Sequence, residues 1–121
     1  MSKRKETGNL GEKIAAEHLK KQGYRILETN YHCRYGEIDI VARHREYLVF
    51  IEVRTKTNLN YGTPEESITE TKMDHLRMAA NRYIQERGYK KDLWRIDIVL
   101  IELNKENKPN RIEIIENAVE E

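Results

Sequence analysis

Two carboxylates stand inside segments that otherwise have the composition of buried β-strands. Asp39 lies in the run GEIDIVAR and Glu52 in the run YLVFIEVRTK, both rich in Val and Ile. Removing an ionised carboxylate from water costs free energy unless the group is paired or binds a cation. The positions of these two acids therefore predict a specific electrostatic partner for them.

The two segments have the spacing of a β-hairpin. A short turn centred on residues 45 and 46 would join them, and residues equally far from that turn would face each other. Asp39 would then lie opposite Glu52, and Glu37 opposite Arg54. A slip of one residue would move these side chains to the other face of the sheet.

Strict alternation along the first of these strands gives each face its own residues. Glu37, Asp39 and Val41 would share one face, and Ile38, Ile40 and Ala42 would share the other.

Facing residues of an antiparallel pair have Cβ atoms about 4.5–5.5 Å apart, and two carboxylates that close repel each other. A hard cation between Asp39 and Glu52, Mg²⁺ or Mn²⁺, would remove that repulsion. Arg54 is one pleat further along and can hold a phosphate oxygen, so the pattern predicts phosphodiester hydrolysis. The alternative on spacing alone is a structural role, with the acids paired to Arg54, Lys56 or Arg95.

The two interpretations differ in what they expect without metal. If the acids face each other to bind a cation, replacing Asp39 or Glu52 by its amide should leave metal-free stability unchanged or higher. If they are members of structural ion pairs, either replacement should lower it.

Length and composition indicate one domain, spanning residues 1–121. The chain is 36% charged and 38% hydrophobic, which predicts a thin core beneath a densely ionised surface. The single cysteine, Cys33, cannot form an internal disulfide, and no apolar run has the length of a signal or membrane segment. We therefore expect a cytoplasmic protein with no membrane partner.

The net charge of +1 argues against binding nucleic acid through a broad basic surface alone. Residues 1–100 carry 19 Lys and Arg against 15 Asp and Glu, whereas residues 101–121 carry 3 against 6. The body is mildly basic and the C-terminal part acidic. We expect residues 1–7 to be a flexible basic segment and residues 117–121 an acidic tail.

Apolar periodicity predicts helices and strands in the order α, β, β, β, α, β, β, which favours an α/β sandwich around one mixed sheet. The segment 57–69 is predicted to be a long loop, mobile without DNA and closing near the metal. The helices are expected at 10–22 and 71–88, and the strands at 24–31, 37–43, 47–56, 94–103 and 111–116.

The motifs in this order resemble a known family. GEIDIV followed by LVFIEVRTK resembles the PD-(D/E)XK nuclease signature. With GNLGEKIAAEHLKKQGYRILETNY before it, and TKMDHLRMAANRYI and WRIDIVLIE after it, residues 8–103 resemble the YraN family of bacterial proteins. That family is similar to archaeal Holliday junction resolvases. The resemblance implies a restriction-endonuclease-like three-layer sandwich with a mixed central sheet and an αβββαβ core.

The resemblance also implies a site. Its metal ligands would be Asp39, Glu52 and the backbone carbonyl of Val53, with Mg²⁺ or Mn²⁺ as the cofactor. Glu12 matches the acid in the first helix of the resolvases, which implies a catalytic role. Without the family, Glu12 is equally an acid in the first turn of a helix, favoured by the helix dipole.

The cations of the site depart from the nuclease signature. Arg54 stands where the signature has Lys, and Arg does not exchange a proton near neutral pH. Lys56, on the same strand face, is the alternative, or Arg54 serves as an electrostatic clamp. Lys72, at the start of the second helix, is expected with Arg54 and Lys56 to contact nucleic acid. We expect Asp97 to form a structural ion pair with Arg95, which lies on the same strand face.

Three functions remain open at this stage. The first is a metal-dependent endonuclease acting on DNA, including branched or distorted DNA, with a homodimer as the expected state because two identical sites suit two symmetric cuts. The second is a nucleic-acid-binding module on the same fold with little or no cleavage. The third is an adaptor that binds another protein.

Overall fold

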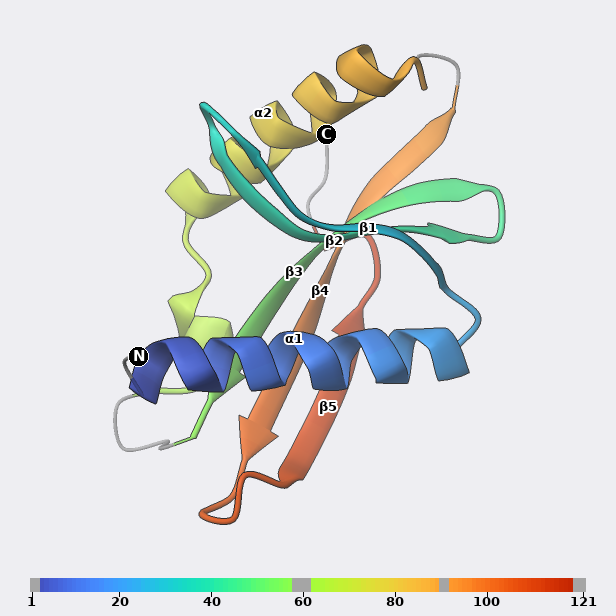
Figure 1. Cartoon of the computed structure of the whole chain (residues 1–121). Helices are drawn as coiled ribbons and strands as arrows, with labels where there is room; N and C mark the ends of the chain where they lie inside the picture. The colour runs from blue at the N-terminus through green and yellow to red at the C-terminus, as the bar shows by residue number, and fades with distance from the viewer. Residues whose placement is uncertain (1–2, 58–61, 90–91, 119–121) are drawn as a thin grey trace.

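The chain folds into three layers, with a five-stranded sheet between two helices (Figure 1). The computed structural model describes residues 3–57, 62–89 and 92–118, and of residues 3–5 the backbone alone. The elements are α1 (Lys3–Lys21), β1 (Arg25–Cys33), β2 (Gly36–His44), β3 (Tyr47–Lys56), the 3₁₀ turn η2 (Glu65–Ser67), α2 (Glu70–Arg87), β4 (Leu93–Leu103) and β5 (Pro109–Ile115).

The sheet is mixed, and its strand order follows the chain from β1 to β5. The first three strands form an antiparallel meander, β4 runs parallel to β3, and β5 returns antiparallel to β4. The parallel pair needs a crossover, which η2 and α2 supply. This architecture confirms the predicted α/β sandwich and its αβββαβ core.

Each helix seals one face of the sheet with apolar side chains. Helix α1 packs Ala15 and Leu19 against one cluster, which includes Val49, Ile51 and Val99. The other face packs against α2 (yellow to orange in Figure 1). That second cluster contains Ile38, Val41, Leu48, Phe50 and Ile96 from the sheet and Leu76, Ala79, Ala80, Tyr83 and Ile84 from α2. Within the described residues, no helix has the length and apolarity that a membrane crossing requires.

The helix boundaries differ from the prediction. Helix α1 begins at Lys3, well before the expected start at Leu10, because Gly8 and Gly11 do not interrupt it. Helix α2 is capped by Thr69, not Thr71, since the Thr69 side chain accepts a hydrogen bond from the Lys72 N–H at 3.1 Å. Of the predicted loop 57–69, residues 58–61 lie outside the described part of the chain.

The β2–β3 hairpin confirms the predicted register. Its pairs run from His44 and Tyr47 at the two-residue turn to Ile40 and Ile51. The prediction that Ile38 shares a face with Ile40 is wrong, because Ile38 packs in the α2 cluster and Ile40 in the α1 cluster. Alternation breaks between them, at Asp39, where the paired part of β2 and β3 ends. Strand β2 therefore separates from β3 at the acid that the sequence singled out.

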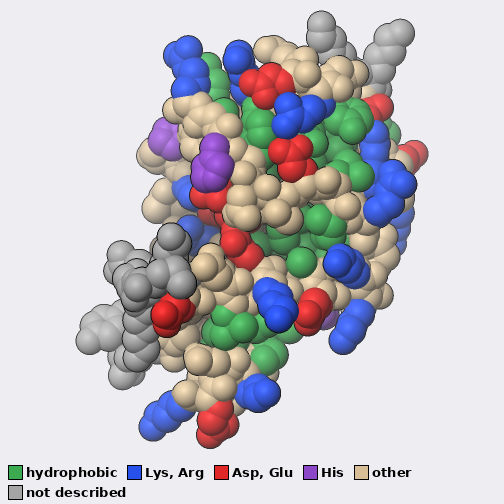
Figure 2. Space-filling view, viewed as in Figure 1, with side chains coloured by type: hydrophobic (Ala, Val, Ile, Leu, Met, Phe, Trp, Pro, Cys, Tyr) green, Lys and Arg blue, Asp and Glu red, His purple; other side chains and the backbone are tan. Residues whose placement is uncertain are grey.

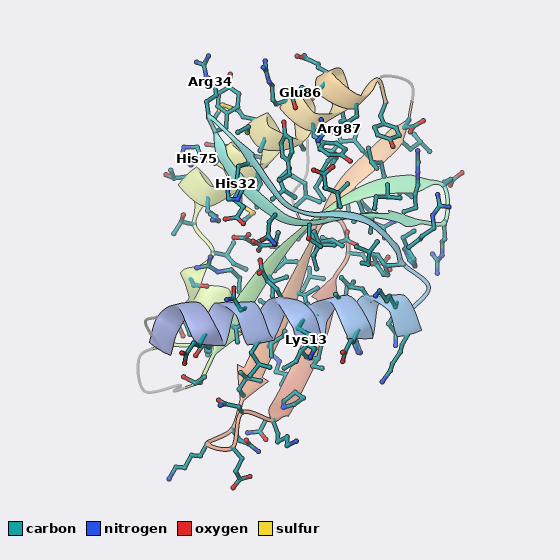
Figure 3. The ribbon with its side chains drawn as sticks, viewed as in Figure 1. Lys13, His32, Arg34, His75, Glu86 and Arg87 are labelled. Atoms are coloured by element: carbon teal, nitrogen blue, oxygen red, sulfur yellow. The ribbon has the colours of Figure 1, made fainter. Side chains whose placement is uncertain are left out.

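Strand β1 is tied to α2 at the far end of the hairpin it forms with β2. Tyr31 donates its hydroxyl to Glu86 at 2.8 Å, and Arg87 lies over the Tyr31 ring. Figure 3 shows Glu86 and Arg87 near the C-terminal end of α2, and His32 and Arg34 on the β1–β2 hairpin. These contacts fix the hairpin against α2.

A buried polar network centres on Asp97, which is fully buried. Its carboxylate accepts hydrogen bonds from the Tyr24 hydroxyl at 2.7 Å, the Arg95 Nε at 2.9 Å and the Asn117 backbone N–H at 2.9 Å. The predicted structural pairing of Arg95 with Asp97 is confirmed. Because Asn117 follows β5, the network also attaches the C-terminal segment to the core.

His44 joins this network as an acceptor. Arg95 Nη2 lies 2.6 Å from His44 Nδ1, and a guanidinium can only donate, so this nitrogen must be unprotonated. Burial and then the charge of Arg95 lower the pKa of His44. The neutral ring stacks on Tyr24 with centroids 3.9 Å apart.

We expect His44 to lower the free energy of unfolding as the pH drops below about 6.5, because the unfolded state then protonates this ring before the folded state does. Urea unfolding of the parent protein and of His44→Gln between about pH 5 and pH 7.5 measures this contribution as the difference between their two slopes. His75→Gln, at an exposed position of α2, should keep the slope of the parent protein. An equal slope in the parent protein and in His44→Gln would contradict the expectation.

Candidate functional site

The site begins with the carboxyl group of Asp39, where β2 leaves β3. If the ladder continued, Ile38 would face Val53, and the Val53 N–H would bond to the β2 backbone. Instead the Val53 N–H donates to Asp39 Oδ2 at 2.8 Å. One side chain thus replaces the missing backbone partner, which fixes the carboxyl group beside β3.

Two further acids lie beside Asp39. One carboxylate oxygen each of Glu12, Glu37 and Asp39 lies within 4.8 Å of the others, and we call these three residues the acidic cluster. Asn30 donates to Glu37 Oε1 at 2.9 Å and to Glu12 Oε1 at 3.2 Å when its amide nitrogen faces them. Acidic side chains beside a histidine reach the surface on this side of the molecule (Figure 2).

Glu12 reaches the cluster because α1 lies very close to β3. A Cβ on Gly11 would stand 2.0 Å from the Thr55 Oγ1, so only glycine allows this approach. Glu12 follows directly and is half-buried. Since α1 starts at Lys3, Glu12 lies well inside the helix, and the alternative of an acid in the first turn does not apply.

Crowding raises the proton affinity of these acids. Burial, followed by repulsion from Glu52, raises the pKa of Asp39 to about 9. Burial also raises the pKa of Glu12, and the charges of Glu37 and Glu52 add to the rise. Around neutral pH, Asp39 therefore keeps its proton until a positive charge replaces it.

Glu52 lies next to Asp39 but has protein cations as partners. Its side chain is 2% exposed, and its Oε2 lies 3.1 Å from Lys72 Nζ and 3.3 Å from Arg54 Nη1. The predicted contact of Asp39 with Glu52 forms, and so does the ion pair of Glu52 with Arg54 that the structural alternative required. Glu52 therefore lies beside Asp39 and is at the same time a member of structural ion pairs.

The three predicted cations have different surroundings. Lys72 lies in the first turn of α2, and its amine reaches the site by forming an ion pair with Glu52. Arg54 donates its Nε–H to Ser67 Oγ at 2.8 Å and its Nη2 to the Ser67 carbonyl at 3.3 Å, so η2 holds it. The β2–β3 pairing ends before the predicted pair of Glu37 with Arg54. Lys56 is half-buried and makes no ion pair with any residue that the structure describes.

Four residues of the site were missed in the sequence analysis. Glu37 is two residues before Asp39 on β2, so its closeness in sequence was the available signal, although strict alternation fails at Asp39. Asn30 occupies left-handed backbone at φ 55°, which asparagine adopts more readily than most residues, and its position in a strand was the hint. Gly11 and Ser67 carried no local signal, because their roles depend on contacts with β3.

The fold and this group of acids and cations define the class: a three-layer α/β protein with nuclease-like architecture and an acid-lined site at the end of a β-hairpin. The model of the uncharacterised protein family UPF0102 matches residues 11–101, and the chain belongs to this family, the same family as YraN.

Curated relatives share nearly the whole chain. A UPF0102 protein of Dehalococcoides mccartyi is 51% identical over 118 residues, covering 98% of this chain and 96% of that protein. One from Caldicellulosiruptor saccharolyticus is 43% identical over 118 residues, covering 98% and 99%. One from Moorella thermoacetica is 44% identical over 115 residues, covering 95% and 96%.

We expect opposite effects of the two amide replacements on metal-free stability. Asp39→Asn should raise the free energy of unfolding by on the order of 1 kcal/mol, because it removes a crowded carboxyl group. Glu52→Gln should lower it by a similar amount, because Lys72 and Arg54 lose their buried partner. Urea unfolding in chelator measures both, and Glu106→Gln, in an exposed turn, is the control for loss of one charge.

A divalent cation should stabilise the parent protein by mass action, because the folded state alone gathers the acidic cluster. Thermal melts with Mg²⁺ or Mn²⁺ added after chelator removal should show a rise in Tm that saturates with metal concentration. Asp39→Asn should abolish the rise, and Glu106→Gln should keep it. A rise of equal size in all three proteins would indicate unspecific binding elsewhere.

Proposed function

We propose that this protein hydrolyses phosphodiester bonds of DNA, with Mg²⁺ or Mn²⁺ bound at the acidic cluster. One observation carries the proposal: three carboxylates and two cations converge on the Asp39–Glu52 contact from α1, β2, β3 and α2. A phosphodiester needs both kinds of partner, a metal for charge neutralisation and cations for its remaining oxygens. A purely structural ion pair would not gather two further acids, Glu12 and Glu37, beside it.

The donor set fits a hard cation. Mg²⁺ and Mn²⁺ prefer carboxylate oxygens, and a bound ion would supply positive charge beside Asp39, whose pKa is raised by burial and then by the charge of Glu52. Asp39, Glu12 and Glu37 would bind the ion, with Glu52 and the Val53 carbonyl as the further ligands that the resemblance implies. The bound ion would neutralise charge on the phosphate and lower the pKa of a water molecule.

The cations would bind the substrate. Arg54 uses three of the five N–H groups of a guanidinium for Ser67 and Glu52, which leaves one on Nη1 and one on Nη2 for phosphate oxygens. Lys72 Nζ carries further donors beside Glu52. Because Arg54 does not exchange protons, its role would be electrostatic, and Lys72, whose amine contacts Glu52, would be the proton-exchanging cation, with Lys56 further along β3 as the alternative.

DNA is the proposed substrate because α1 and the β1–β2 hairpin, which supply the acidic cluster, also carry exposed cations. Lys13 on α1 and Arg34 at the β1–β2 hairpin are exposed, and Arg34 lies over the Tyr35 ring (Figure 3). Arginine and tyrosine side chains of this kind bind phosphates and stack on bases. Branched DNA is the preferred form within this proposal, from the resemblance to resolvases.

A DNA-binding module without cleavage is the second candidate. It is favoured by Glu52, whose charge is already neutralised by Lys72 and Arg54 without any metal. Such a site would bind phosphate through its cations and use the acids to bind a structural ion.

A cleavage screen tests the proposal. Linear, nicked, flapped and four-way DNA are incubated with Mn²⁺ or Mg²⁺ and the parent protein, and product is expected on at least one of them. Asp39→Asn and Glu52→Gln, purified in the same way, should lose cleavage by at least about a hundredfold, since each removes charge next to the phosphate.

The outcomes separate the candidates. Glu106→Gln is the matched charge control and should cleave like the parent protein. Salt-sensitive DNA binding without cleavage in any metal would favour the second candidate. Cleavage that persists in Asp39→Asn would show a contaminating nuclease and contradict the proposal.

A further inference from the structure

The turn η2 lies outside the acidic cluster but contacts the site through Arg54. Ser67 accepts two hydrogen bonds from the guanidinium. Its hydroxyl oxygen accepts from Nε–H at 2.8 Å, and its backbone carbonyl accepts from Nη2 at 3.3 Å. Nε and Nη2 form one edge of a planar group, so Ser67 contacts that edge at two points. The third nitrogen, Nη1, faces Glu52 at 3.3 Å. The guanidinium plane is thereby fixed in position and rotation.

Ser67 is itself held rigidly. Its hydroxyl donates to the Pro64 carbonyl at 2.5 Å, and the Ser67 N–H donates to the same carbonyl at 3.1 Å. The Pro64 side chain is buried. Since the Ser67 hydroxyl donates to Pro64, it can only accept from Arg54, so both hydrogen bonds have a fixed direction.

A second contact attaches η2 to β5, an edge strand of the sheet. Arg111 of β5 donates to both carboxylate oxygens of Glu65, at 3.1 and 2.7 Å. The same guanidinium contacts Glu102 of β4 at 2.6 Å and Glu113 of β5 at 2.9 Å. The turn is therefore attached to β3 through Arg54 and to β5 through Arg111, which leaves it little freedom to move relative to the site.

We propose that Ser67 is a positioning residue for Arg54, and that η2 exists in this place to orient the Arg54 guanidinium toward a substrate phosphate. The inference rests on the proposed function, since it assigns the free Nη1 and Nη2 donors to that phosphate. A free arginine side chain loses rotamer entropy when it binds. Arg54 has already lost it in the folded protein, so its donors are oriented before the substrate arrives.

The spectroscopic test follows the Nε–H of Arg54 by ¹⁵N–¹H NMR, with the resonance assigned by its loss in Arg54→Lys. A hydrogen-bonded Nε–H exchanges slowly with water, so the parent protein should give a narrow signal. Ser67→Ala should broaden or lose it, and Ser67→Thr, which keeps the hydroxyl, should restore it. Thr63→Ala is the matched control, because the Thr63 hydroxyl contacts Glu66 of the same turn and not Arg54.

The functional test measures the Kd for four-way DNA in chelator and kcat with Mn²⁺. Ser67→Ala should weaken binding or slow cleavage by about tenfold, as expected for a lost hydrogen bond to a charged group, and Ser67→Thr should recover most of the loss. Thr63→Ala should match the parent protein in both measurements. General damage to the turn would affect Thr63→Ala and Ser67→Ala alike and would overturn the inference.

The two proposals fail in different ways. If the parent protein neither binds nor cleaves DNA, the proposed function is wrong, and the Nε–H resonance alone decides whether Ser67 fixes Arg54. A resonance that stays narrow in Ser67→Ala contradicts the positioning role whatever the DNA results. Loss of the signal in Ser67→Ala with no recovery in Ser67→Thr contradicts it as well.

Discussion

The hydrogen bond from the Val53 N–H to the Asp39 carboxylate is the contact on which the candidate site depends. It occurs because β2 and β3 stop pairing after Ile40 and Ile51, which leaves a backbone donor without its partner. A side-chain acceptor at that point satisfies the donor, but it also places a carboxyl group among Glu12, Glu37 and Glu52. The end of the β2–β3 pairing therefore explains both the side-chain acceptor at Val53 and the crowding of the Asp39 carboxyl group with other acids.

The charges around Asp39 are arranged asymmetrically. On one side Glu12 and Glu37 add negative charge. The Asn30 amide contacts both of them, Glu12 also hydrogen-bonds to the Asp39 carboxyl group, and Glu37 lies 3.8 Å from His32. On the other side Glu52 is neutralised by Lys72 and Arg54. An ion would therefore be drawn to the first side and a phosphate to the second, which places the reacting groups in a fixed order across Asp39.

Contacts from α1 and η2 position the charged residues around Asp39. Gly11 lets α1 approach β3 closely enough to bring Glu12 into contact, and η2 fixes Arg54 through Ser67. The buried network of Asp97 on β4 joins Tyr24, just before β1, to Asn117 in the segment after β5. Arg95 and Asp97 pair with each other in that network, whereas Glu12 and Glu37 beside Asp39 have no described cation at ion-pair distance except His32. This difference distinguishes a structural cluster from a candidate site.

The sequence alone determined the fold class, the order of helices and strands along the chain and the β2–β3 register, because strand and helix periodicity and a two-residue turn are local properties of the chain. It also singled out Asp39 and Glu52, since charged residues within apolar strands break a local pattern. Strict alternation failed at Ile38, because the separation of β2 from β3 is decided by packing against both helices. The partners of Glu52 and Arg54 come from α2 and η2, and the approach of Glu12 depends on Gly11 meeting Thr55. Only the tertiary structure decided these contacts, because each joins segments far apart in the chain and no local pattern encodes which of several acids and cations will meet.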